Sequence, residues 1–234
     1  WFGCACCPSN IARLIPQIPG MIYSQTEKDI FCGLYAGSNV EIALADTKVK
    51  LDQKTGYPFD GNINIQVDPE KEGSEFTLWV RIPTWTSDRF IPGELYRYAD
   101  AQKTSASVKV NGKKVRTAPV DGYIPLKRNW NTGDTVEVEL DMPVRYNIAD
   151  ERVEADIDRV CITRGPILYC AEEPDNQENP SDYIIDEIGK EFTAERFSDG
   201  ILKGIPSLTA EFPALQPDNK ETDATLTLIP YYAW

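Results

Sequence analysis

The sequence predicts a mainly β fold, built as a sandwich of the jelly-roll kind. Seventeen Pro and 15 Gly among 234 residues suit many short strands and turns better than long helices. Short runs of alternating apolar and polar residues recur along most of the chain, separated by turn signals. Hydrophobic residues make up 41% of the chain, and its length allows one large all-β domain or two ordinary ones.

A helix is predicted at residues 8–18, P-S-N-I-A-R-L-I-P-Q-I. Pro8 and Ser9 are residue types that open helices. Four apolar residues then fall on one face at helical spacing: Ile11, Leu14, Ile15 and Ile18. Pro16 and Pro19 are expected to kink or end this helix, because proline lacks the N–H that a helix interior needs.

Strand patterns begin after the helix and run through the first half of the chain. Residues 30–36 and 39–51 are predicted to form a hairpin. Three further strands are predicted from apolar residues at every second position: 62–67, 76–82 and 135–140. The clearest hairpin is 105–115, because Asn111-Gly112 suits the two positive-φ positions of a type I′ turn.

The composition changes near Asn147. Residues 148–200 contain 15 acidic and 5 basic side chains, so most of the net charge of −13 lies in this stretch. Strand-like patterns resume in three places: 183–188, 191–197 and 207–212. The last segment, 224–234, is strongly apolar, and we therefore expect it to be buried in a sheet.

Charge and composition exclude several classes of function. A pI near 4.5 argues against nucleic acid or an anionic membrane as the main partner. No run approaches the roughly 20 apolar residues of a membrane span. The chain has no histidine, which removes histidine-based catalytic triads, histidine general bases and histidine-containing metal sites.

Three of the six cysteines lie in the first seven residues: Cys4, Cys6 and Cys7. Thiolates are the reactive and metal-binding form, and the positive end of a helix favours them. Sulfur ligands without histidine favour zinc or an iron–sulfur centre, but a closed zinc site takes four ligands. From spacing alone, reduced thiols at a helix start rank above a complete metal site. The other cysteines lie in apolar runs and are expected to be buried: Cys32, Cys161 and Cys170.

Two further features could bind ligands. Aromatic residues could stack on sugars, although core packing is their commoner role: Trp79, Trp85, Trp130, Tyr96, Tyr98 and Tyr123. The acidic residues of 148–200 could bind calcium, but no D-x-[DN]-x-[DN]-G loop is present, and acidic surfaces are usually solvated.

Five motifs in order resemble one enzyme family. W-F-G-C-A-C-C-P-S-N-I-A-R-L at the start of the chain resembles the C-C-P-x-N-x-A-R signature of glycoside hydrolase family 127, the β-L-arabinofuranosidase family related to family 146. The other four are F-T-L-W-V-R-I-P-T-W, G-Y-I-P-L-K-R-N-W-N-T-G-D-T-V-E-V-E-L-D-M-P-V-R, D-R-V-C-I-T-R-G-P-I-L-Y-C-A-E and L-I-P-Y-Y-A-W. The resemblance therefore covers nearly the whole chain, with gaps.

The resemblance implies a catalytic (α/α)₆ barrel followed by two β-sandwich domains. In that architecture residues 1–29 are the end of the barrel. Residues 30–147 together with 224–234 form the first sandwich, and 148–223 form a second, smaller β domain. The chain also begins at Trp1 and not at Met, and we expect it to be the C-terminal part of a longer protein.

The resemblance also implies a mechanism. Members are retaining hydrolases that remove β-L-arabinofuranose through a zinc-bound cysteine nucleophile. Cys6 matches the nucleophile and is also a zinc ligand, Cys7 matches a second zinc ligand, and Cys4 matches neither role. The remaining ligands and the glutamate acid/base precede this motif in the family, so this chain alone is expected to hold an incomplete zinc site and to be inactive. Ser9 stands where many members have a second proline.

Other classes of function remain open at this point. The chain could be a non-catalytic β-sandwich module that braces a catalytic domain or binds an arabinofuranose-containing glycan. It could also be a redox or structural zinc module built on the cysteines at 4, 6 and 7. Zinc analysis and carbohydrate binding of the isolated chain distinguish these alternatives.

Overall fold

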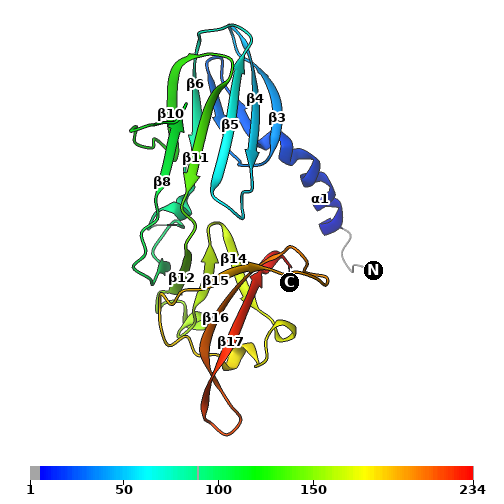
Figure 1. The fold of residues 1–234 in the computed structure, drawn as a ribbon, viewed down its shortest axis with the longest axis vertical. Coiled ribbons are helices and arrows are strands. Elements are labelled where there is room, and N and C mark those ends of the chain that lie inside the picture. Colours follow the sequence, from blue (N-terminus) through cyan, green and yellow to red (C-terminus); the bar gives the residue numbers. More distant parts are fainter. Residues whose placement is uncertain (1–5, 89, 234) are drawn as a thin grey trace. The chain divides into compact units, whose positions relative to one another are not determined.

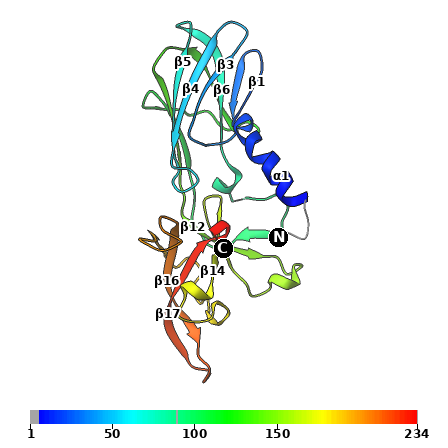
Figure 2. The same ribbon diagram turned by 90° about the vertical axis from the view of Figure 1, so that its right-hand side faces the viewer.

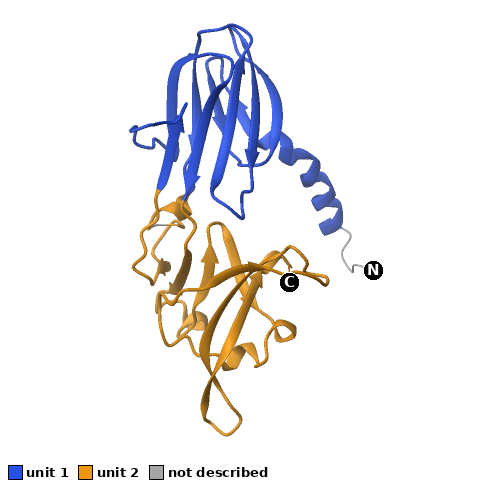
Figure 3. Ribbon diagram, in the orientation of Figure 1, with its two compact units in different colours: residues 1–83, 106–140 blue, residues 84–105, 141–234 orange. Residues whose placement is uncertain are grey.

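The computed structural model describes residues 6–88 and 90–233, which form two compact units (Figures 1 and 3). Unit 1 contains residues 1–83 and 106–140, and unit 2 contains residues 84–105 and 141–234. The two units together hold three mainly antiparallel sheets, which confirms the mainly β fold predicted from the sequence. None of the helices in the described part of the chain has the length and apolar character that crossing a bilayer requires.

Unit 1 is a sandwich of two sheets preceded by a helix (Figures 1 and 2). The helix is α1 (Cys6–Leu14), and it continues into a 3₁₀ helix, η1 (Ile15–Met21). The four-stranded sheet has the order β1 (Tyr23–Gln25), β2 (Asp29–Cys32), β6 (Ser74–Arg81), β10 (Tyr123–Trp130). The six-stranded sheet has the order β3 (Ser38–Ala43), β4 (Lys48–Thr55), β5 (Asn62–Pro69), β11 (Asp134–Leu140), β8 (Ala106–Val110), β9 (Lys113–Lys114).

The core of unit 1 lies between the inner faces of these two sheets. On β6 the predicted alternation is confirmed, because Phe76, Leu78 and Val80 are buried while the residues between them are half-buried. Trp130 is completely buried, and its indole N–H donates to the carbonyl oxygen of Phe76 at 3.1 Å. Strand spacing therefore gives this unit an apolar interior, in which the buried Trp130 N–H is paired.

Two strand pairings of unit 1 test the predicted hairpins. The β8–β9 hairpin is confirmed, with Asn111 and Gly112 at φ 50° and 71° as a type I′ turn requires. The predicted hairpin of 30–36 with 39–51 is wrong. β2 instead runs parallel to β6, and β3 pairs with β4. β2 and β6 lie more than 40 residues apart in the sequence. Alternation within a single strand does not show which distant strand it pairs with.

Unit 2 contains a single seven-stranded antiparallel sheet. Its order is β15 (Thr193–Arg196), β16 (Pro206–Leu215), β17 (Glu221–Pro230), β14 (Ile167–Ala171), β13 (Cys161–Arg164), β12 (Val144–Ala149), β7 (Tyr96–Tyr98). Short 3₁₀ helices lie in this unit: η2 (Thr84–Thr86), η3 (Glu154–Asp156), η4 (Glu173–Asp175), η5 (Pro180–Asp182) and η6 (Tyr231–Ala233). Residues 183–188, predicted as a strand, make a single bridge, between Tyr183 and Ala214.

Two segments of the chain lie in a different unit from the one that was predicted for them. Residues 224–234 do not return to the first sandwich, since β17 pairs with β14 and β16 inside unit 2. Residues 84–105 also belong to unit 2, where β7 pairs with β12. Unit 2 therefore contains more of the chain than the segment 148–223 that was expected to form the second domain. The expected burial of the apolar end holds for β17, where Leu226, Leu228 and Ile229 are buried, but Tyr231 and Tyr232 beyond it are exposed.

Candidate cysteine site

The described part of helix α1 runs from Cys6 to Leu14, so Cys6 and Cys7 lie in its first described turn. The helix therefore already includes the two residues before Pro8, where the sequence predicted its start. Pro8 fits the first turn, where its missing N–H would have no partner within the helix. The Ser9 hydroxyl donates to the carbonyl oxygen of Cys6 at 3.0 Å, which ties the first turn together. Both thiols therefore lie in the N-terminal part of the described helix, toward the positive side of its dipole.

The two thiols are exposed and close together. The Sγ atoms of Cys6 and Cys7 are 3.8 Å apart. Two sulfurs bound to one zinc ion at about 2.3 Å with tetrahedral angles are themselves about 3.8 Å apart. Cys6 and Cys7 therefore fit two of the four ligand positions of a tetrahedral zinc site.

The rest of such a site is not found in the described residues. Among residues 6–88 and 90–233, no group of three or more Cys, Asp or Glu side chains gathers to hold a metal ion. Cys4, the third cysteine of the cluster, lies outside the described residues. The acidic stretch 148–200, considered above as a calcium site, forms no such group in its described residues either.

The remaining cysteines differ in their surroundings. Cys32 is completely buried, as predicted, and its burial raises the pKa of the thiol to about 12. Cys170 is half-buried. Cys161 is exposed, contrary to the prediction, because Ile162 takes the inward position on β13 and the preceding residue faces outward. None of these three lies in the first turn of α1.

The aromatic candidates do not gather into one sugar-stacking surface. Trp130 lies in the core of unit 1, and Trp79 stacks on Phe31 with ring centroids 5.3 Å apart. Tyr98 lies under the guanidinium of Arg145, whose central carbon is 3.6 Å from the ring centroid. The other three are half-buried or exposed and lie in both units: Trp85, Tyr96 and Tyr123.

The apolar face of the N-terminal helix is exposed. Neither α1 nor η1 contains a buried residue, and α1 extends away from the sheets of unit 1 (Figures 1 and 2). Five large apolar side chains of this segment are exposed: Ile11, Leu14, Ile15, Ile18 and Met21. Isolated apolar residues are common on surfaces, but a contiguous set at helical spacing marks a surface that packs against another element.

Two family models match almost all of the chain. Residues 29–142 match the middle domain of the family described as β-L-arabinofuranosidase, GH127. Residues 144–234 match the glycoside hydrolase family 127 C-terminal domain. The chain belongs to glycoside hydrolase family 127. The motif resemblance noted in the sequence is thereby confirmed, and the boundary between the models falls at residue 143, four residues before Asn147.

Relatives of family 127 are similar along the whole chain. A non-reducing end β-L-arabinofuranosidase of Bifidobacterium longum subsp. longum is 31% identical over 100% of this chain. A solved GH127 β-arabinofuranosidase structure superposes with a TM-score of 0.92 at 41% identity, and a GH127 β-L-arabinofuranosidase from Geobacillus stearothermophilus T6 with 0.85 at 34%. Both superpositions include 100% of this chain.

The chain spans little more than a third of these relatives. It covers 35% of the Bifidobacterium protein and 37% and 36% of the two solved chains. Most of each relative therefore lies outside the region to which this sequence corresponds.

Proposed function

We propose that this chain is the C-terminal part of a retaining glycoside hydrolase that acts on β-L-arabinofuranosides, with Cys6 as the nucleophile. The observation that carries the proposal is the Cys6–Cys7 pair. Its two sulfurs share the first turn of α1, 3.8 Å apart, in a chain of family 127. The substrate class follows from the relatives, which are described as β-L-arabinofuranosidases.

The chemistry assigns a separate role to each thiol. Cys6 and Cys7 would hold zinc, which when bound keeps the Cys6 sulfur as a thiolate without a separate base. The Cys6 sulfur attacks the anomeric carbon, forming a C–S bond as the bond to the leaving oxygen breaks. The leaving oxygen takes its proton from a general acid in the preceding part of the parent protein. Water then cleaves the C–S bond, and two displacements at one carbon retain its configuration.

The same proposal gives α1 and η1 a place in the parent protein. We infer that residues 1–29 are the end of the catalytic (α/α)₆ barrel, and that the exposed apolar face of this segment packs against preceding barrel helices. The exposed fractions of Ile11 and Ile15, 57% and 59%, support this role, since burial of such side chains stabilises a fold. The two β units then brace the barrel that carries the nucleophile.

The experiment uses the full-length parent protein with an aryl β-L-arabinofuranoside. We expect the first-formed sugar to have the β configuration by NMR, and we expect Cys6→Ser or zinc chelation to lower kcat by at least ~10³-fold. Cys161→Ser is the matched control, because it removes an exposed thiol that lies on unit 2, outside the first turn of α1. An inverted product, or an active Cys6→Ser variant, contradicts the proposal. The 234-residue chain alone should show no turnover.

A further inference from the structure

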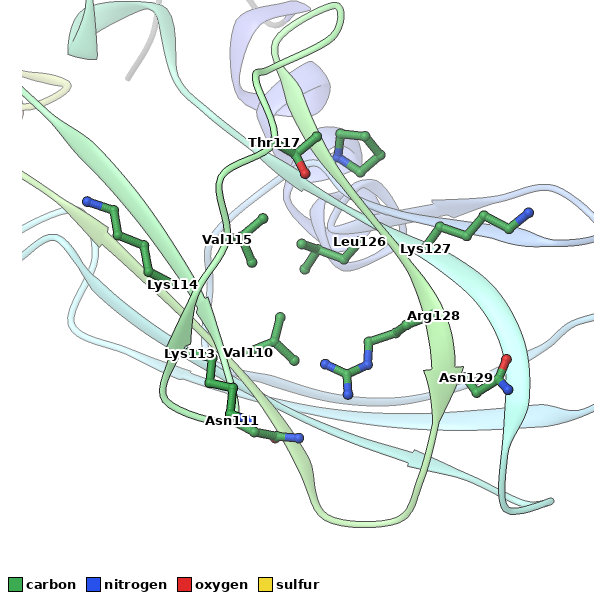
Figure 4. Close-up of a pocket in the computed structure, with 11 residues that line it drawn as sticks. Val110, Asn111, Lys113, Lys114, Val115, Thr117, Leu126, Lys127, Arg128 and Asn129 are labelled. Carbon is green, nitrogen blue, oxygen red and sulfur yellow. The ribbon is translucent and has the colours of Figure 1, made fainter.

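A groove opens at one edge of the unit 1 sandwich, between β10 and the β8–β9 hairpin (Figure 4). β10 is the last strand of the four-stranded sheet and β9 the last strand of the six-stranded sheet. The groove has a volume of about 600 Å³, which is within the usual range of small-molecule sites. Its lining comes entirely from residues 110–129 of unit 1.

Arg128 occupies an inward position in this groove. Along β10 the inward residues are Leu126, Arg128 and Trp130, so a guanidinium stands where the pattern calls for an apolar side chain. Figure 4 shows the Arg128 side chain reaching across the groove toward Val110. Its central guanidinium carbon is 5.2 Å from the Trp130 ring centroid, a cation–π distance that fixes the group in place.

The Arg128 guanidinium has hydrogen-bonding capacity left over. Its Nε atom is buried and has no hydrogen-bond partner among the described residues. Because this atom is shielded from solvent, a ligand in the groove meets the outer Nη atoms of the guanidinium and not Nε. A carboxylate matches these outer donors, because its two oxygens can accept parallel hydrogen bonds from the two Nη atoms.

The charge around the groove also favours an anion. Its lining includes four cationic side chains and no carboxylate, in a chain whose net charge is −13: Lys113, Lys114, Lys127 and Arg128. Figure 4 shows Lys114 and Lys127 pointing away from the groove. Lys127 pairs with Glu75, with 3.4 Å between Nζ and Oε1, so Lys113 and Lys114 supply most of the long-range attraction. Direct contact with a ligand is made by Arg128.

The floor of the groove is apolar. Val110, Val115 and Leu126 point into it beside the Arg128 guanidinium (Figure 4). A simple inorganic anion would use the charge but not this floor or this volume. A sugar ring presents C–H groups on one face and hydroxyl groups at its edge, so a sugar that carries a carboxylate matches both surfaces.

We propose that this groove is a binding site for a carboxylate-bearing sugar, a hexuronate unit of an acidic glycan, anchored by Arg128. The site is separate from the cysteine chemistry and would bind a charged part of a glycan in addition to the sugar that is cleaved. The competing explanation is purely structural, since an inward-pointing charge on an edge strand also prevents edge-to-edge association.

The test is an NMR titration of the ¹⁵N-labelled 234-residue chain. The Nε–Hε signal of Arg128 is assigned by its absence from the spectrum of Arg128→Gln. Its chemical shift is then followed as galacturonate, galactose, acetate or inorganic phosphate is added. We expect galacturonate to shift this signal with a dissociation constant of about 1 mM or tighter, and galactose, acetate and phosphate to bind at least ~10-fold more weakly. Arg128→Gln should weaken galacturonate binding at least ~10-fold, read from backbone amides of β8 and β10.

Two controls keep the result interpretable. Lys103→Gln removes one exposed positive charge from unit 2 and should bind galacturonate as the wild type does. Arg128→Lys keeps the charge but loses the paired donors, so it should bind between the wild type and Arg128→Gln, with unchanged backbone shifts elsewhere. Absence of a galacturonate shift, equal binding of phosphate or galactose, or unchanged binding by Arg128→Gln would overturn the proposal.

Discussion

The thiol of Cys32 donates a hydrogen bond to Oε1 of Gln53, with 3.5 Å between the two atoms. The pair joins the two sheets of unit 1, since Cys32 ends β2 and Gln53 lies on β4. Gln53 in turn donates to the carbonyl oxygen of Ala36 at 2.8 Å. A buried polar pair of this kind fixes the position of neighbouring strands. Cys32 is therefore a structural cysteine, unlike the exposed Cys6 and Cys7.

The different surroundings of these cysteines predict different reactivity. Burial raises the pKa of Cys32 to about 12, so at pH 8 this thiol is almost entirely protonated as well as shielded from reagents. At pH 8, a disulfide reagent should therefore modify Cys7 in the native chain and Cys32 only after unfolding in urea. Peptide mass spectrometry at successive times measures both rates. Modification of Cys32 in the native chain as fast as Cys7 would show that the core of unit 1 opens readily.

The exposed apolar face of α1 and η1 predicts a substitution whose effect depends on the length of the protein. Ile15→Glu should leave the unfolding midpoint of the 234-residue chain nearly unchanged, because Ile15 is 59% exposed there. In the parent protein it should destabilise by more than about 2 kcal/mol, because a charge would be buried against the barrel. Gln17→Glu adds the same charge at an exposed polar position of η1 and is the control. Equal effects in both proteins would refute the barrel assignment.

Asp100 and Arg145 form the buried ion pair of unit 2. Their side chains are 1% and 4% exposed, the Nε–Oδ1 distance is 2.7 Å, and the second carboxylate oxygen accepts from the backbone N–H of Tyr146. Asp100→Ala should lower the free energy of unfolding by about 3–5 kcal/mol, because Arg145 would stay buried without its counter-ion. Asp150→Ala, which breaks an exposed pair with Arg152 in the same unit, should cost far less, because solvent screens that pair. Urea unfolding, monitored by a signal that comes from unit 2, measures the unfolding free energy of both variants. Equal losses of unfolding free energy in the two variants would contradict this account.

The hydrogen bonds to Asp29 predict that the stability of unit 1 depends on pH. A hydrogen bond from the Trp79 indole N–H, 3.0 Å from Oδ1, lowers the pKa of Asp29, and a second bond from Thr26 at 2.8 Å adds to this effect. A lowered folded-state pKa stabilises the fold above the unfolded pKa, and this stability is lost as pH falls through the folded pKa. Between pH 7 and pH 3 the wild type should therefore lose more unfolding free energy than Asp29→Asn.

Glu75→Gln serves as the control for this pH series, because Glu75 is an exposed carboxylate of the same unit. It should follow the wild-type dependence closely. Parallel curves for the wild type and Asp29→Asn in urea titrations at pH 7, 5 and 3 would mean that the Trp79–Asp29 bond does not stabilise the charged carboxylate.

Local patterns predicted those parts of the fold whose causes are local. Asn and Gly both tolerate positive φ, so Asn111-Gly112 predicts a type I′ turn from these two residues alone. The alternation of apolar residues on β6 likewise indicates which face of the strand packs in the core. The parallel pairing of β2 with β6 and the place of β17 in unit 2 depend on partners far along the chain. No short window of sequence contains that information.

The candidate sites follow the same division. The thiol pair at Cys6 and Cys7 was visible from spacing, but its meaning came from the family motif, because two sulfurs supply half of a metal site. The sequence around Arg128 does contain a local signal. Arg128 is a charged residue at an inward position of β10, between Leu126 and Trp130. The sequence does not show that this position faces a groove, because the opposite wall comes from the β8–β9 hairpin.

The most direct test of the nucleophile is to identify the atom that becomes glycosylated. The parent protein would be treated with an electrophilic β-L-arabinofuranosyl analogue, digested with trypsin and examined by peptide mass spectrometry. The account predicts one sugar adduct on the peptide that ends at Arg13, located on the sulfur of Cys6, and no adduct in Cys6→Ser. A covalent adduct on a carboxylate, or on Cys7 with Cys6 unmodified, would contradict it.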